Sequence, residues 1–164
     1  MKNVFKLMSL NILLITSLCF SITTEDIYDN SWALIIGIDK YESVQKLNYA
    51  VKDAQTMQDI LLNTFAFPSE NITLLIDEKA NKQRILQAFS NITKNANEND
   101  RVVIFFAGHG ETMDLPEGGE MGYLMPVDGD RNDLYLSSIG MDELKKISLM
   151  SKAKHVLFLV DACY

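Results

Sequence analysis

His109 and Cys163 are the two residues of this chain whose types could carry out covalent chemistry together. Each follows a short apolar run, at 101–107 in the first case and at 155–160 in the second. A cysteine attacks a carbonyl as its thiolate and therefore needs a nearby base. Imidazole titrates near neutrality and can return the proton to a leaving amine. The pair indicates a cysteine hydrolase, with Cys163 as the nucleophile and His109 as the base.

The residues around His109 fit the same chemistry. Gly108 and Gly110 leave the backbone open to a substrate, and a backbone amide beside the imidazole could bind an oxyanion together with the Cys163 amide. His155 begins a strand, at the opposite edge of the sheet from the thiol, so we reject it as the base. The plainer alternatives are that His109 only ends a strand and that Cys163 is a small core residue.

The elements that must position these residues alternate along the chain. Nearly uninterrupted apolar runs predict parallel strands that are covered on both faces, and helical spacing of apolar residues predicts the segments between them. The predicted strands are 32–38, 71–76, 101–107 and 155–160, and the predicted helices are 48–64, 81–95 and one marked by Met141, Leu144, Ile147 and Met150. The segment 111–133 is predicted to be a loop with an extended piece at 122–127.

This order predicts an α/β fold with a parallel, doubly wound sheet and helices on both faces. Ligands and chemistry gather at the carboxyl ends of the strands in such sheets. Because His109 and Cys163 both follow a strand, we expect them at the same edge of the sheet.

The N-terminal segment differs from the rest. Residues 1–21 combine Lys2 and Lys6 with an uncharged apolar stretch at 7–20, which indicates a signal peptide and export, to the medium or the periplasm. An uncleaved membrane anchor is the alternative; after cleavage we expect no stable membrane span. Residues 22–30 are predicted to be a linker and 31–164 the domain.

Charge and cysteine content limit the partners. Removal of Lys2 and Lys6 without any acid would lower the formal charge from −7 to −9. Such a charge argues against a nucleic-acid partner and suits a basic protein or peptide substrate better. The sequence has two cysteines, and Cys19 would leave with the signal peptide. Cys163 would then be a lone thiol in an exported protein, which marks it as a candidate reactive group.

Four motifs together resemble the caspase-like cysteine peptidases, and most nearly the metacaspases and the bacterial caspase-domain proteins. They are Trp32–Tyr41, Lys52-Asp53-Ala54, Phe-Phe-Ala-Gly-His-Gly at 105–110 and Val-Asp-Ala-Cys at 160–163. The resemblance covers roughly residues 31–164. It implies a three-layer α/β/α sandwich with a mostly parallel sheet, a His109–Cys163 dyad, and an oxyanion site formed by the amides of Gly110 and Cys163.

The resemblance also implies a substrate pocket. Asp161 stands where caspases carry glutamine, and in metacaspases this aspartate and the one matched by Asp53 line the pocket for the residue before the cut. Two carboxylates would select Arg or Lys by charge pairing. Asp53 is equally well explained as a first-turn helix carboxylate favoured by the helix dipole. Asp161 at the end of a core strand needs a stronger reason, because burying a charge is costly.

The sequence also departs from the family. Family members continue past the nucleophile with further strands and helices, whereas this chain stops at Tyr164. We therefore expect the C-terminal part of the domain to be missing, and the 164-residue chain alone to be inactive and poorly soluble. Metacaspases often bind calcium through an aspartate-rich stretch after the histidine. No acidic residue here aligns with that stretch, so we assign no metal and no cofactor, and calcium activation stays open.

Three functions remain in view. The first is an endopeptidase that cuts after Arg or Lys. The second is an inactive caspase-like module that binds peptides or proteins, or a non-functional fragment. The third is a flavodoxin-like or receiver-like sheet that binds a phosphorylated ligand. The third would need a glycine-rich loop after the first strand, and residues 37–41 do not form one.

Overall fold

The computed structural model describes residues 27–163. The expected signal peptide, most of the expected linker and Tyr164 lie outside these residues. The elements are, in chain order, β1 (Ser31–Gly37), α1 (Ala50–Asn63), η2 (Ser69–Asn71), β2 (Ile72–Ile76), η3 (Asp77–Lys79), α2 (Lys82–Asn95), β3 (Arg101–Asp114), β4 (Glu120–Leu124), α3 (Leu134–Ser137), β5 (Ile139–Gly140), α4 (Met141–Met150) and β6 (His155–Cys163).

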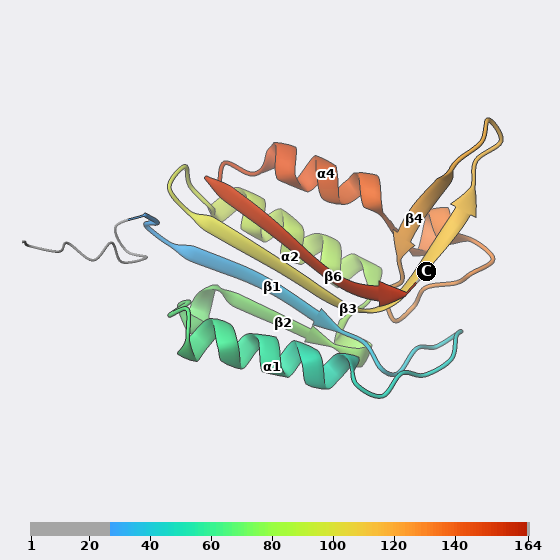
Figure 1. Ribbon diagram of the computed structural model, residues 1–164, viewed down its shortest axis with the longest axis horizontal. Helices are drawn as coiled ribbons and strands as arrows, with labels where there is room; N and C mark the ends of the chain where they lie inside the picture. Colours follow the sequence, from blue (N-terminus) through green and yellow to red (C-terminus); the bar gives the residue numbers. More distant parts are fainter. Residues whose placement is uncertain (1–26, 164) are drawn as a thin grey trace, which may run out of the picture.

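The four predicted strands form a parallel sheet. β1 pairs with β2 on one side and with β3 on the other, and β3 pairs with β6 (Figure 1). All three pairings are parallel, because each connection returns to the same end of the sheet through a helix. The spatial order of these strands is therefore β2, β1, β3, β6, and their carboxyl ends share one edge.

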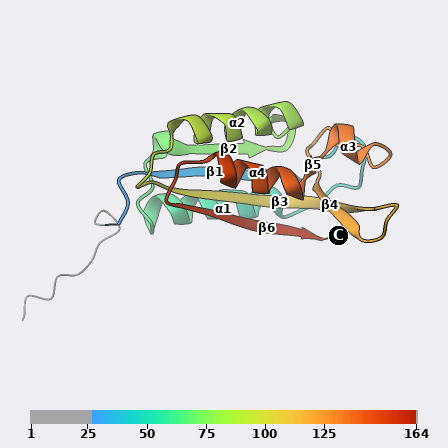
Figure 2. The ribbon, with the colours of Figure 1, turned by 90° about the horizontal axis from the view of Figure 1, so that it is seen from above.

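Helices cover both faces of this sheet. α1 packs on one face, where Ala50 and Ala54 join a core with Ala33 and Ile35 of β1. α2 and α4 pack on the other face, and Figure 2 shows α1 and α2 on opposite sides of the strands. The α/β class and the three-layer sandwich predicted above are confirmed.

The predicted loop at 111–133 is wrong in part. β3 does not end at Ala107 but continues to Asp114, and its last five residues pair antiparallel with β4, which in turn pairs with β5. The hairpin turns through Gly118 and Gly119, whose φ angles of 92° and 89° suit glycine. The polar residues at 111–114 gave no strand signal because they project beyond the helical layers, and most of them are exposed.

The expectation that β6 is buried on both faces is also wrong. Within residues 27–163, β6 pairs on one side only, and Leu157 and Val160 are 51% and 38% exposed. Leu157 and Val160 lie on opposite faces of the strand. Val156 and Phe158 pack against one core and Leu159 against the other, so each face of β6 is only partly covered. No helix of the described residues is long and apolar enough to cross a membrane.

Candidate active site

The two residues predicted to react lie on neighbouring strands. His109 of β3 and Cys163 of β6 are register partners in the parallel ladder, and Ala107 is paired with Asp161 two residues earlier. Both pairs lie at the carboxyl edge of the sheet, as expected. β1 ends two rungs before His109, at the pair formed by Gly37 and Ala107. The edge is thus stepped, and His109 extends past its neighbour on the β1 side.

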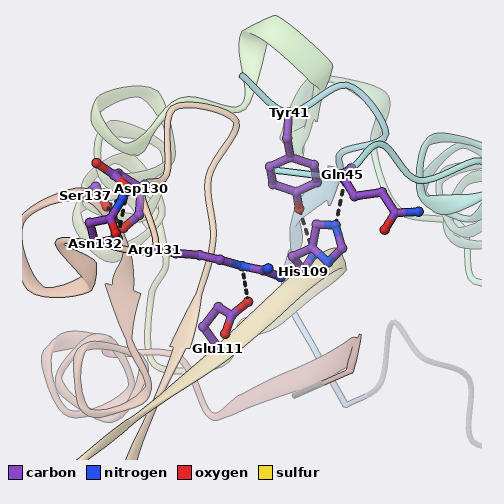
Figure 3. A network of polar contacts seen from close by, with 8 residues as sticks. All are labelled: Tyr41, Gln45, His109, Glu111, Asp130, Arg131, Asn132 and Ser137. Atoms are coloured by element: carbon purple, nitrogen blue, oxygen red, sulfur yellow. Dashed lines mark hydrogen bonds and ion pairs between the residues drawn. The ribbon is translucent and has the colours of Figure 1, made fainter. Parts of the chain in front are cut away.

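The imidazole of His109 is held by a backbone carbonyl. Its Nε2 lies 2.8 Å from the carbonyl oxygen of Gln45, in the loop between β1 and α1 (Figure 3). A carbonyl oxygen can only accept a hydrogen bond, so Nε2 must carry the proton. In neutral imidazole the other ring nitrogen, Nδ1, then has a free lone pair and can act as a base.

The backbone of His109 is held as well. Its N–H donates to the hydroxyl of Tyr41 (2.7 Å), and its carbonyl accepts from the N–H of Met125 (3.0 Å). The Tyr41 and His109 rings are also in contact, with centroids 4.8 Å apart and planes at 52°. Burial raises the pKa of the Tyr41 hydroxyl above its ordinary value, against the lowering effect of the His109 N–H, so the hydroxyl stays protonated.

The structure explains why position 108 is a glycine, which the sequence did not reveal. A Cβ at this position would lie 2.4 Å from the Tyr41 hydroxyl oxygen and about 3 Å from the Phe106 ring. The missing side chain thus makes room for Tyr41, rather than for a substrate as the motif alone suggested.

A cleft beside His109 brings the predicted pocket residues together. It has a volume of about 390 Å³ and opens between the β1–α1 loop and the ends of β3 and β6. Asp53, His109 and Asp161 all line it. The remaining lining residues are Gln45, Lys46, Leu47, Asn48, Tyr49, Ala50, Ala107 and Gly108.

The two carboxylates reach the cleft from different elements. Asp53 lies in the first turn of α1, so the helix-dipole explanation and the pocket explanation both fit its position. Asp161 is exposed, and the argument that its charge is buried at a core strand end is therefore wrong. The same one-sided pairing that exposes β6 exposes Asp161.

Asp77 fixes the loop that supplies Tyr41 and Gln45. Its Oδ1 accepts from the N–H groups of Asp39 and Lys40 (2.9 and 3.0 Å), and its Oδ2 pairs with the Lys40 ammonium at 3.3 Å. Burial tends to raise the pKa of Asp77, but these hydrogen bonds and the Lys40 charge outweigh it, so the pKa is lowered. Asp39 then accepts from the N–H of Ala50 (2.9 Å) and caps α1.

Two further observations complete the site. Glu111, two residues after His109, forms an ion pair with Arg131, which ties β3 to the segment after β4 (Figure 3). Among residues 27–163, no three side chains of the His, Cys, Asp and Glu types gather into a group that could hold a metal ion. Calcium therefore stays unassigned.

Sequence reasoning missed Tyr41, Gln45 and Asp77. Gln45 acts through its carbonyl, which every residue has, so its type carries no signal. Tyr41 did carry a signal, because it follows β1, the strand next to β3, and must therefore lie near the same edge of the sheet. Asp77 has a positive φ of 45°, and it follows β2 directly at that edge.

The structure is an α/β/α sandwich that places His109 and Cys163 on adjacent strand ends, beside a cleft lined by Asp53 and Asp161. Residues 30–164 match the family model described as the caspase domain. The chain belongs to the caspase domain family.

The chain is similar to proteins named metacaspases. It is 31% identical over 147 residues to Metacaspase-1 of Eremothecium gossypii, an alignment that covers 82% of this chain and 32% of the relative. It is 34% identical over 106 residues to Metacaspase-1A of Aspergillus oryzae, covering 58% of this chain and 25% of the relative. The chain therefore spans about a third or less of the length of these relatives.

A solved structure agrees on the fold. The crystal structure of a Geobacter sulfurreducens protein superposes with a TM-score of 0.68 and 21% identity, over 82% of this chain and 50% of the other. At that identity the likeness concerns the fold alone.

Proposed function

We propose that this domain is a cysteine endopeptidase that hydrolyses peptide bonds after Arg or Lys. The observation that carries the proposal is the register pairing of His109 with Cys163 at the edge of a cleft that Asp53 and Asp161 also line. Membership of the caspase domain family and similarity to proteins named metacaspases support the reaction class.

The proposed reaction begins at His109. Because Nε2 is engaged by the Gln45 carbonyl, Nδ1 is the ring nitrogen available to take the thiol proton of Cys163. Strand alternation assigns positions 161 and 163 to one face, and their partners Ala107 and His109 share it. Ala107 belongs to the core under α1, so the reaction would occur on the α1 face, where the cleft opens.

Two chemical steps would follow. The thiolate adds to the carbonyl carbon of the scissile bond, and the resulting oxyanion accepts hydrogen bonds from the amides of Gly110 and Cys163. The protonated imidazole then gives its proton to the leaving amine, which leaves a thioester on Cys163. Water, activated by the same imidazole, attacks the thioester and releases the acid. Losing one oxyanion donor typically lowers kcat by about 10²- to 10³-fold.

The carboxylates would set specificity. A guanidinium or ammonium group that enters the cleft can pair with Asp53 and Asp161, whereas an acidic side chain would be repelled by both. Both carboxylates are exposed in the described residues, so each pairing is expected to contribute modestly.

Peptide reporters test the proposal. Because the 164-residue chain alone is expected to be inactive, a longer form that supplies the C-terminal part of the domain should be assayed with matched reporters that end in Arg, Lys, Leu or Asp. We expect turnover of the Arg and Lys reporters that Cys163→Ala and His109→Ala each abolish. Preference for the Asp reporter would refute the pocket assignment, and activity that survives Cys163→Ala would refute the nucleophile. Retained peptide binding without turnover in the longer protein would favour a binding module.

A further inference from the structure

The end of β1 leaves a gap in the hydrogen bonding of β3. The β1–β3 ladder ends where Gly37 pairs with Ala107, and the last backbone bond runs from the N–H of Ile38 to the carbonyl of Ala107. The next N–H of β3 on the β1 side belongs to His109, and it has no strand beside it. An unpaired backbone N–H in a half-buried strand costs free energy and allows the strand to move.

Tyr41 fills this gap with a side chain. Its ring is buried in the core under α2 and α4, and its hydroxyl accepts the His109 N–H at 2.7 Å. The contact of the two rings holds the imidazole from the same direction. Gly108 allows the approach, since a Cβ there would overlap the hydroxyl. Figure 3 shows Tyr41 and the Gln45 carbonyl reaching His109 from the same β1–α1 loop.

We propose that Tyr41 is a positioning residue for the reaction proposed above, which keeps the His109 imidazole in the Nε2–H tautomer facing Gln45 and so leaves Nδ1 available to Cys163. This inference rests on the proposed function for its consequence, but the tautomer itself can be measured without any catalysis. Asp77 supports the arrangement, since it accepts hydrogen bonds from the N–H groups of Asp39 and Lys40, the two residues that precede Tyr41.

The first experiment measures the tautomer. Nitrogen-15 chemical shifts of the imidazole rings should be recorded near pH 8 in the longer form used for the reporter assays, with His109→Ala used to assign the His109 signals. We expect a single Nε2–H tautomer for His109 in the original chain and a mixture of tautomers in Tyr41→Phe. Tyr123→Phe is the matched control, because it removes a hydroxyl from a tyrosine that is equally buried and contacts Met121 instead. An unchanged single tautomer in Tyr41→Phe would overturn the inference.

The second experiment links the tautomer to Cys163. The rate at which iodoacetamide alkylates Cys163 should be followed by mass spectrometry of the peptide that contains it, from pH 5.5 to 9. At pH 6.5 we expect Tyr41→Phe to be alkylated about three- to tenfold more slowly than Tyr123→Phe, the range expected for loss of one hydrogen bond. A shift in stability without this change in the pH profile would mean that Tyr41 is only structural.

The outcomes separate the two proposals. If His109→Ala leaves the alkylation profile unchanged, the dyad and hence the proposed function fail, whatever the tautomer result. If His109→Ala alters the profile and Tyr41→Phe behaves as Tyr123→Phe, only the positioning role fails.

Gly108→Ala provides an independent route to the same state, and it serves if Tyr41→Phe does not fold. The added Cβ would displace the hydroxyl of Tyr41 from His109 and should slow alkylation in the same way. In the Tyr41→Phe chain the same substitution should do less harm, because the hydroxyl is already absent. Fully additive effects would contradict the proposal.

Discussion

His109 and Cys163 are direct partners across the β3–β6 ladder, yet the atoms that hold His109 come from the other side of β3. The N–H and the ring of His109 are both bonded to the loop between β1 and α1, through Tyr41 and Gln45. The base and its proposed nucleophile are thus placed by sheet register, and the orientation of the base is set by a loop. Variants of the loop should therefore affect the chemistry more than the fold.

Asp77→Asn should destabilise the protein most at neutral pH. The lowered pKa of Asp77 means that its carboxylate stabilises the fold above the unfolded pKa of about 3.9, and that this contribution is lost as pH falls through the folded pKa. Loss of charge-assisted hydrogen bonds predicts about 1.5–3 kcal/mol at pH 7. Asparagine tolerates the positive φ, so the substitution isolates the charge.

Urea unfolding at pH 7 and at pH 3.5 measures this effect. The free-energy difference between Asp77→Asn and the original chain should shrink at the lower pH, and Asp59→Asn, an exposed carboxylate on α1, should show little difference at either. A constant difference at both pH values would mean that Asp77 acts through shape rather than charge.

Gly37→Ala should destabilise the packing of α1 against the sheet. A Cβ there would lie 2.5 Å from both the Ala50 carbonyl oxygen and the Ala54 Cβ. Overpacking of this kind typically costs about 1–3 kcal/mol. Thermal unfolding should show the lower stability of Gly37→Ala. Adding Ala54→Gly removes one of the two clashes, so the double variant should regain part of the lost stability once the cost of about 1 kcal/mol for glycine in a helix is subtracted. No recovery in the double variant would place the strain at the Ala50 carbonyl.

Asp161→Asn and Asp53→Asn should lower kcat/KM for Arg reporters by about two- to fivefold each, which corresponds to about 0.4–1 kcal/mol for an exposed pair. Turnover of a Leu reporter should stay within about twofold, because the lost interaction needs a cation on the substrate. Equal losses on Arg and Leu reporters would show that the carboxylates support the fold or the dyad instead of selecting the substrate.

Gln45→Ala should leave the site intact. The contact with His109 uses the main-chain carbonyl, which alanine retains, so alkylation of Cys163 and reporter turnover should both stay within about twofold. A large loss would mean that the Gln45 side chain itself takes part.

The sequence predicted the parts of this fold that periodicity can encode. The four parallel strands, the three main helices and the shared edge of His109 and Cys163 follow from apolar runs and from the carboxyl-end rule. The extension of β3 to Asp114 could not be found this way, because a hairpin outside the helical layers needs no apolar residues. The apolar run at 155–160 predicted a strand but not how completely each of its faces is covered.

The Gly-His-Gly motif could not predict the contacts that hold His109. The glycines beside it were interpreted as space for a substrate, whereas Gly108 makes room for Tyr41. Side chains that satisfy a single backbone group at a strand end depend on where neighbouring strands stop, and that depends on register rather than on composition. The grouping of Asp53, His109 and Asp161 in one cleft, by contrast, is what the family resemblance led us to expect.

Covalent labelling by a peptide electrophile tests the central claim most directly. An Arg-ending peptidyl chloromethyl ketone and its Asp-ending counterpart should be incubated with the protein and with His109→Ala, and the modified residue identified by mass spectrometry. We predict that the Arg compound labels Cys163 in preference to the Asp compound, and that His109→Ala abolishes this labelling while the fold persists. Labelling that is indifferent to His109, or that favours the Asp compound, would contradict a His109–Cys163 peptidase with an acidic pocket.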